Sequence, residues 1–121
     1  MLQVFGIKNC NTVKKALNWL DGKNISYEFL DVKKNTLQQE SMEAWVEDMP
    51  DNYSWDRLVN KSGITWRNLS EKEKTMGLNP KTAIELILQK PSVMKRPVII
   101  KNKKVIIIGY DETEFEENLN D

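Results

Sequence analysis

The sequence predicts an α/β fold built on a mixed four-stranded sheet, with a helical insertion between the second and third strands. Three observations support this prediction. The chain opens with an apolar run, a helix-periodic segment and a second apolar run. A block of roughly 55 residues with helical signals follows. Two β-branched runs joined by a short polar turn, and then a last helical segment, close the chain.

The first three elements are a strand, a helix and a strand. Residues 2–5 form an apolar run that Gly6 closes, which predicts a buried strand. Four apolar residues then recur at the spacing of one helical face: Val13, Ala16, Leu17 and Leu20. We expect Gly22 at the C′ position that ends this helix. Residues 25–32 combine aromatic and β-branched side chains and predict the second strand.

The insertion, about residues 36–92, begins with a predicted helix. Thr36 and Gln39 have the spacing of a capping box. Apolar residues at helical spacing come next: Met42, Trp45, Val46 and Met49. Pro50 breaks this helix, and a shorter helix is expected over residues 54–60.

Two further helix starts are marked within the insertion. Ser70 and Glu73 repeat the spacing of a capping box, and the brief helix that they open is expected to stop near Gly77. Asn79 followed by Pro80 is typical of an N-cap and a first helical turn. The sequence therefore predicts one more inserted helix, which begins at Pro80.

The end of the chain predicts a hairpin and a helix. Residues 97–100 and 104–108 are β-branched runs separated by a short polar turn, so these strands are antiparallel. Asp111 and Glu114 cap a final helix. The first two strands need a helical crossover and are therefore parallel. Together the elements describe a single thioredoxin-like domain over residues 1–121, and another α+β sandwich is the alternative.

Composition excludes several classes of function. The 121 residues carry 18 basic and 18 acidic side chains, so no overall positive field favours direct binding to nucleic acid or to a membrane. With no His and one Cys, the chain lacks the residues of a Ser-His-Asp triad, and we expect no metal site. The N-terminus has no signal peptide and the longest apolar run, residues 105–108, is too short to span a bilayer. We therefore expect a cytoplasmic protein whose lone thiol stays reduced.

Cys10 is the main catalytic candidate. It lies in the turn between the first strand and the first helix, where free N–H groups favour an anion and lower the pKa of a thiol. Lys8 adds positive charge, and Asn9, Asn11 and Thr12 make the turn polar. The alternative is an inert, buried cysteine, but a polar turn is a poor place to bury one.

Arginine is scarce in this chain, which has fifteen Lys and three Arg: Arg57, Arg67 and Arg96. A guanidinium grips oxyanions through paired hydrogen bonds, as an ammonium does not. Arg96 precedes Pro97 at the start of the third strand, and a cis peptide there would bring it near Cys10. The alternatives are a solvated Arg96 and an ordinary trans Pro97. For Arg67, next to Trp66, the alternative is an exposed loop side chain.

These motifs resemble one known family along the whole chain. They are the run of residues 6–16 around Cys10, Trp66-Arg67, Lys95-Arg96-Pro97 and Gly109-Tyr110. The sequence is similar to the ArsC/Spx family of thioredoxin-fold proteins, and within it to the YffB-like, arsenate-reductase-like branch. The resemblance implies that Cys10 is the nucleophile and that Arg96 precedes a cis proline and helps to hold an oxyanion or glutathione. It also implies that Arg67 faces the active site.

The chain departs from its relatives at informative positions. Arsenate reductases of the family carry arginines where this chain has Asn60 and Gly109, so arsenate is a doubtful substrate. Spx-type regulators carry Cys-x-x-Cys, whereas the fourth position here is Val13. With one thiol, the second electron-carrying thiol must come from another molecule. The resemblance implies a glutathione-dependent thiol reductase or transferase, with glutathione as co-substrate and no tightly bound cofactor. The alternative is a non-enzymatic, Spx-like regulator that binds the RNA polymerase α-subunit.

Overall fold

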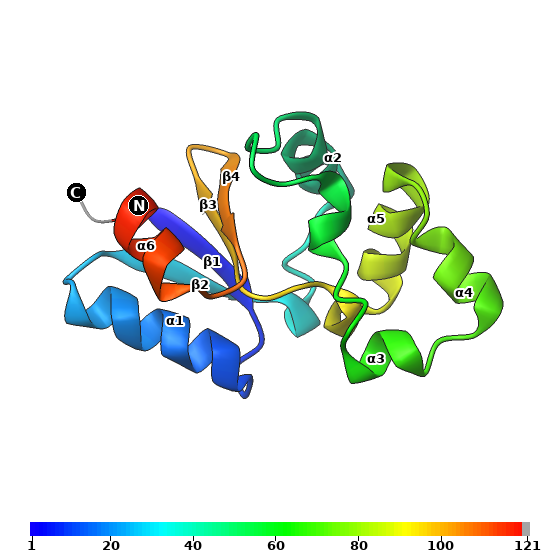
Figure 1. The fold of residues 1–121 in the computed structure, drawn as a ribbon, viewed down its shortest axis with the longest axis horizontal. Helices are drawn as coiled ribbons and strands as arrows, with labels where there is room; N and C mark the ends of the chain where they lie inside the picture. The colour runs from blue at the N-terminus through cyan, green and yellow to red at the C-terminus, as the bar shows by residue number, and fades with distance from the viewer. Residues whose placement is uncertain (120–121) are drawn as a thin grey trace.

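The structure, a computed structural model, describes residues 1–119 and contains a mixed four-stranded sheet (Figure 1). The strands are β1 (Leu2–Gly6), β2 (Tyr27–Asp31), β3 (Val98–Lys101) and β4 (Lys104–Ile108). Their order across the sheet is β2-β1-β3-β4. The predicted domain boundary at residue 121 lies outside the described residues.

The pairing of the strands agrees with the thioredoxin-like prediction. β1 runs parallel to β2, with Leu2 opposite Tyr27 and Gly6 opposite Asp31. β1 and β3 are antiparallel, and so are β3 and β4, which form the predicted hairpin. The parallel pair places the end of β1 and the end of β2 at the same edge of the sheet, where the turn that carries Cys10 begins.

One face of the sheet is covered by α1 (Asn11–Gly22) and α6 (Glu112–Leu119), as Figure 1 shows. Side chains alternate along a strand, so every second strand residue points to this face. We call the resulting cluster the α1-side core: Leu2, Val4, Ala16, Leu20, Ile99, Ile107, Phe115 and Leu119. Its centre is inaccessible to solvent, because Val4, Leu20 and Phe115 are fully buried.

The inserted elements are η1 (Val32–Lys34), α2 (Gln39–Glu47), η2 (Trp55–Leu58), α3 (Ile64–Arg67), α4 (Glu71–Met76), α5 (Pro80–Gln89) and η3 (Pro91–Val93). They lie on the side of the opposite face of the sheet, where α2 contacts β4, while α3 and α4 extend away from the strands (Figure 1). Phe5 and Val98 from the sheet join Trp45, Ile87 and Met94 in what we call the insert-side core. The rings of Phe5 and Trp45 meet edge to face, with centroids 5.0 Å apart.

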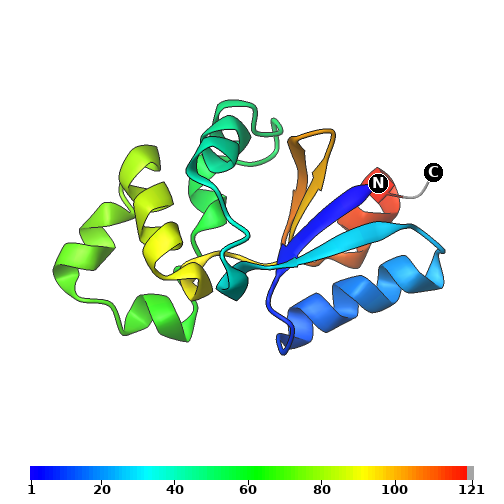
Figure 2. The same cartoon turned by 180° about the vertical axis from the view of Figure 1, so that it is seen from behind.

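The chain enters and leaves the insertion at neighbouring points. Figure 2 shows β2 running directly into the insertion and the segment before β3 returning beside it. The return segment is tied to the insertion by backbone hydrogen bonds from Lys95 N to Leu58 O (2.8 Å) and from Asn60 N to Val93 O (2.8 Å). The start of β3 is therefore held by the inserted helices as well as by the sheet.

Two local predictions are wrong. Thr36 and Gln39 form no capping box, because the Thr36 hydroxyl donates to the carbonyl oxygen of Asp31 (2.9 Å) and α2 begins after Gln38 without a side-chain cap. Gly22 is the last helical residue of α1 rather than its C′ residue. The left-handed backbone falls two positions later, at Asn24 with φ of 58°, and asparagine tolerates this conformation.

The other caps agree with the sequence. Ser70 Oγ accepts from Glu73 N (3.1 Å), and the Glu73 carboxylate accepts from Ser70 N (3.0 Å). The Asn79 side chain accepts from Thr82 N at the start of α5 (3.0 Å). Within residues 1–119, no helix is both long and apolar enough to cross a lipid bilayer.

Candidate active site

Cys10 is the N-cap residue of α1, in the turn that follows β1. Its own N–H donates to Ile7 O (3.2 Å), and its carbonyl oxygen accepts from Lys14 N (3.0 Å), the first hydrogen bond of the helix. The turn is tight because Gly6 packs against α1: a Cβ added at Gly6 would lie 2.9 Å from Val13 Cγ2. Cys10 therefore lies at the N-terminus of a 12-residue helix, whose first N–H groups have no partner within the helix.

The environment of Cys10 favours the thiolate. Partial burial raises the pKa of the thiol, but the N–H groups of Val13 and Thr12 and the Arg96 side chain lower it, Arg96 also through its positive charge. The net effect is a pKa below the ordinary thiol value of 9.0. A thiolate is the reactive form of cysteine in nucleophilic attack.

The Arg96 side chain is held by backbone carbonyl oxygens. Its Nη1 donates to the carbonyl oxygens of Ser92 (2.8 Å) and Met94 (2.9 Å), at the end of the insertion. The Arg96-Pro97 peptide is cis, as the resemblance implied. Pro97 is buried, and its carbonyl oxygen accepts from Gly109 N (2.7 Å) beside β4. Arg96 therefore meets the thiol as a positioned guanidinium rather than as a solvated charge.

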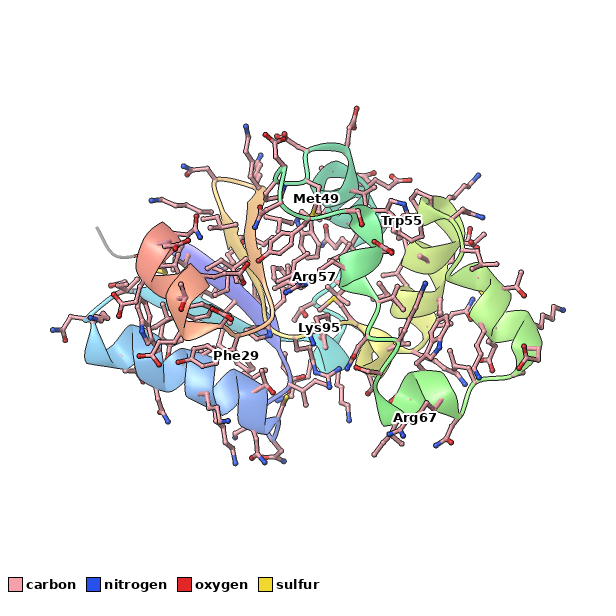
Figure 3. The ribbon with its side chains drawn as sticks, in the orientation of Figure 1. Phe29, Met49, Trp55, Arg57, Arg67 and Lys95 are labelled. Carbon is pink, nitrogen blue, oxygen red and sulfur yellow. The ribbon has the colours of Figure 1, made fainter. Side chains whose placement is uncertain are left out.

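The other predicted site residues occupy two places. Lys8 and Asn9 are exposed in the turn before Cys10, and Asn11 and Thr12 are exposed in the first turn of α1. They surround the thiol in sequence and are open to a ligand. Arg67 is exposed at the end of α3, and its side chain makes no hydrogen bond or ion pair within residues 1–119. Figure 3 shows it on the insertion, away from the other labelled cations.

Two basic residues that sequence reasoning did not assign to the site lie close to it. A Cβ at Gly109 would lie 3.3 Å from Lys95 Cε and 4.0 Å from Arg57 Nη2. Both side chains therefore approach the glycine whose N–H donates to the carbonyl oxygen of Pro97. The scarcity of arginine had marked Arg57, but no pattern in the sequence connects η2 to the end of β4. Lys95 belongs to the Lys95-Arg96-Pro97 motif, but no pattern in the sequence assigns its side chain a role in the site.

The arrangement suits attack by one thiolate in a positively charged setting. Cys10 is the only cysteine of the chain, so an internal disulfide cannot form. Within the described residues, no group of three or more Cys, Asp or Glu side chains is placed to hold a metal ion. Asn60, where arsenate reductases of the family carry an arginine, is occupied locally: its Oδ1 accepts from Ser62 Oγ (3.0 Å).

Comparison with known proteins gives one consistent family. A curated relative from Haemophilus influenzae, named only as an uncharacterized protein, is 39% identical over 96% of both chains. The global transcriptional regulator Spx of Lactococcus lactis is 24% identical over 95% of this chain and 83% of its own length.

Solved structures agree with the sequence comparison. A protein named YFFB matches with a TM-score of 0.85 and 33% identity over 98% of this chain and 99% of its own. A possible arsenate reductase from Streptococcus mutans matches with a TM-score of 0.82 and 29% identity over 100% and 98% of the two chains. The model of the ArsC family matches residues 5–118. The chain therefore belongs to the arsenate-reductase-like ArsC family.

Proposed function

We propose that this protein is a glutathione-dependent thiol reductase or transferase in which Cys10 forms a mixed disulfide. The observation that carries the proposal is the place of Cys10 as N-cap residue of α1, where the N–H groups of Val13 and Thr12 and the Arg96 side chain lower the pKa of its thiol. These groups stabilise the thiolate, so no histidine is needed as a base.

The chemistry takes two balanced steps. The Cys10 thiolate attacks one sulfur of a substrate that carries glutathione in disulfide linkage, and the substrate leaves as a thiolate. A second glutathione thiolate then attacks the glutathionyl sulfur on Cys10. This step releases oxidised glutathione and restores the Cys10 thiolate. In the net reaction one disulfide breaks and one forms: the substrate sulfur becomes a thiolate, and one glutathione thiolate is incorporated into oxidised glutathione.

The surrounding residues supply binding rather than electrons. Arg96 would hold a carboxylate or oxyanion of the substrate or of glutathione, and the buried Pro97 lies directly after it. Lys8 in the turn before Cys10 adds positive charge, and the exposed side chains of Asn9, Asn11 and Thr12 can donate hydrogen bonds. Arg67 would take part by approaching bound substrate from α3. A cytoplasmic location, where glutathione keeps thiols reduced, belongs to the same proposal.

Mass spectrometry tests this proposal directly. Incubation of the wild-type protein with oxidised glutathione should add one glutathione to Cys10, and reduced glutathione should remove it. Cys10→Ser, the matched control, has no thiol and should stay unmodified. Turnover of a glutathionylated peptide with glutathione should require Cys10. A wild-type protein that forms no adduct, or an adduct that glutathione does not remove, would contradict the proposed cycle.

A second candidate function is transcriptional regulation, because Spx regulators are among the relatives. In this alternative the protein binds the RNA polymerase α-subunit and its thiol is not essential. It predicts a stable complex with the C-terminal domain of that subunit, which Cys10→Ser preserves. Absence of a complex in a pull-down with both proteins would exclude it. The missing second cysteine at Val13 favours the reductase, since no internal disulfide switch can form.

A further inference from the structure

Two basic side chains meet beside Gly109, whose N–H donates to the carbonyl oxygen of Pro97. Gly109, with φ of +88°, follows β4 and has no side chain to fill the space above it. Lys95 and Arg57 extend into this space, as their distances from a Cβ at Gly109 show: 3.3 Å to Lys95 Cε and 4.0 Å to Arg57 Nη2. Figure 3 shows both between the sheet and the inserted helices. Two segments that are far apart in sequence thus bring positive charge to one point.

The Arg57 side chain is held by contacts within the protein. Its Nη2 donates to Ile108 O (3.3 Å), and its guanidinium carbon lies 4.9 Å from the centre of the Tyr53 ring. Tyr53 is itself held, because its hydroxyl accepts from Ile108 N (3.3 Å) and donates to Glu114 Oε1 (3.0 Å). A guanidinium has five N–H donors, and the hydrogen bond to Ile108 uses one. The remaining donors of this ordered group are available to an oxyanion.

The positive charge at this point has no carboxylate partner within residues 1–119. The ion pairs of the described chain use other lysines: Lys23, Lys90 and Lys104. Arg57 and Lys95 form none, and Arg96, next to Lys95, donates to backbone carbonyl oxygens and lowers the pKa of Cys10. Lys95 and Arg96 are neighbours on the return segment, and Arg57 reaches the end of β4 beside Lys95, which favours an anionic ligand there.

We propose that Arg57 and Lys95 form a carboxylate-binding subsite that selects acidic disulfides and thiols as partners of Cys10. The inference rests on the proposed thiol chemistry and adds its specificity. Arg57 and Lys95 take no part in electron transfer: the Cys10 thiolate attacks one sulfur of a disulfide, a mixed disulfide forms, and the other half leaves as a thiolate. The subsite holds a carboxylate carried by the disulfide while this exchange occurs.

The test compares two disulfides of different charge. The rate constant of Cys10 is measured with the dianionic 5,5′-dithiobis(2-nitrobenzoate) and with the neutral 4,4′-dithiodipyridine. The variants are Arg57→Gln, Lys95→Gln and the double variant. Lys101→Gln, at the far end of β3, removes the same charge elsewhere and is the matched control. A change in the pKa of Cys10 affects both reagents, so the ratio of the two rate constants isolates recognition of the carboxylates.

We expect each single variant to lower the ratio of anionic to neutral rate by about threefold, and the double variant by about tenfold. Lys101→Gln should keep the wild-type ratio, and Arg57→Lys should restore part of it. High salt should lower the ratio in the wild-type protein without any substitution.

An unchanged ratio in the double variant, or an equal loss in Lys101→Gln, would overturn the subsite. So would a wild-type ratio that does not respond to salt. Failure of the proposed function looks different, because Cys10 would then form no reversible adduct with glutathione while its ratio of rates stays sensitive to Arg57 and Lys95. The two hypotheses can therefore fail separately.

Discussion

The Arg96 guanidinium lowers the pKa of the Cys10 thiol, although the two residues lie on segments from opposite ends of the chain. Arg96 reaches the thiol from the end of the insertion, where Ser92 and Met94 hold its Nη1. Cys10 reaches it from the start of α1. The contact makes the acidity of the thiol depend on how these two parts of the protein are joined.

The first prediction concerns Arg96→Gln, which removes the positive charge next to the thiol. The pKa of Cys10 should rise towards the ordinary value of 9.0. At a pH below both pKa values, the variant should react with a neutral disulfide more slowly than the wild type. The rate constant should fall by up to roughly tenfold for each unit of difference between the two pKa values. The thiolate absorbance in the ultraviolet, followed against pH, measures the change. Lys101→Gln is the charge-matched control, and an unaltered titration in Arg96→Gln would show that Arg96 does not stabilise the thiolate.

The second prediction links the thiol to folding. Because the pKa of Cys10 is lower in the folded protein than in the unfolded chain, ionisation favours the folded state. This stabilisation is fully present above pH 9.0, the unfolded value, and is lost as the pH falls through the folded pKa. The free energy of unfolding of the wild type, minus that of Cys10→Ser, should therefore increase with pH over that window. Urea denaturation of both proteins measures it, and a constant difference or a decrease would contradict the assignment.

The third prediction concerns the packing that shapes the Cys10 turn. Gly6→Ala places a methyl group 2.9 Å from Val13 Cγ2 and 3.1 Å from its Cγ1, and a β-branched side chain has little freedom to move. We expect a loss of about 1–3 kcal/mol in the free energy of unfolding. In the double variant Gly6→Ala/Val13→Ala, the added methyl fills space that Val13 has vacated. The double variant should thus be more stable than the sum of the single effects, and simple additivity would count against this contact.

The fourth prediction is an acid-sensitive helix start in the insertion. The hydrogen bond from Lys90 and the capping contacts of Ser70 hold the pKa of Glu73 at about 2, against an ordinary value of 4.5. The stability that these contacts confer is present above pH 4.5 and is lost as the pH falls towards about 2. Glu73→Gln should flatten this part of the stability profile. Glu71→Gln, in the same helical turn, keeps Glu73 and should retain the wild-type slope.

Much of the fold could be predicted because local signals and tertiary structure agree. The β-branched runs of the hairpin, the Ser70–Glu73 capping box and the Asn79-Pro80 helix start all occur where the sequence indicated. The capping box at Thr36 failed for a tertiary reason: a nearby carbonyl oxygen, that of Asp31, took the hydroxyl. The short helix α3 carries too few residues for a periodic pattern, so Trp66 and Arg67 read as a loop.

The site was predictable in part for the same reason. Cys10 follows from its place between a strand and a helix, and Arg96 from its place before Pro97. The approach of Arg57 to Gly109 joins η2 to the end of β4, and no spacing in the sequence encodes such a contact. The residues that line this part of the site became visible only once the insertion was packed against the sheet.

The two hydrophobic cores give the Cys10–Arg96 contact a further meaning. Cys10 is carried by α1, which belongs to the α1-side core, whereas Arg96 is anchored beside Val93 and Met94 of the insert-side core. The sheet separates the two cores, and the thiol and the guanidinium lie near each other at its edge. The reactivity of Cys10 therefore depends on how the α1-side core and the insert-side core are aligned. A substitution in either core, remote from the thiol, should therefore change the rate at which a neutral disulfide reacts with Cys10.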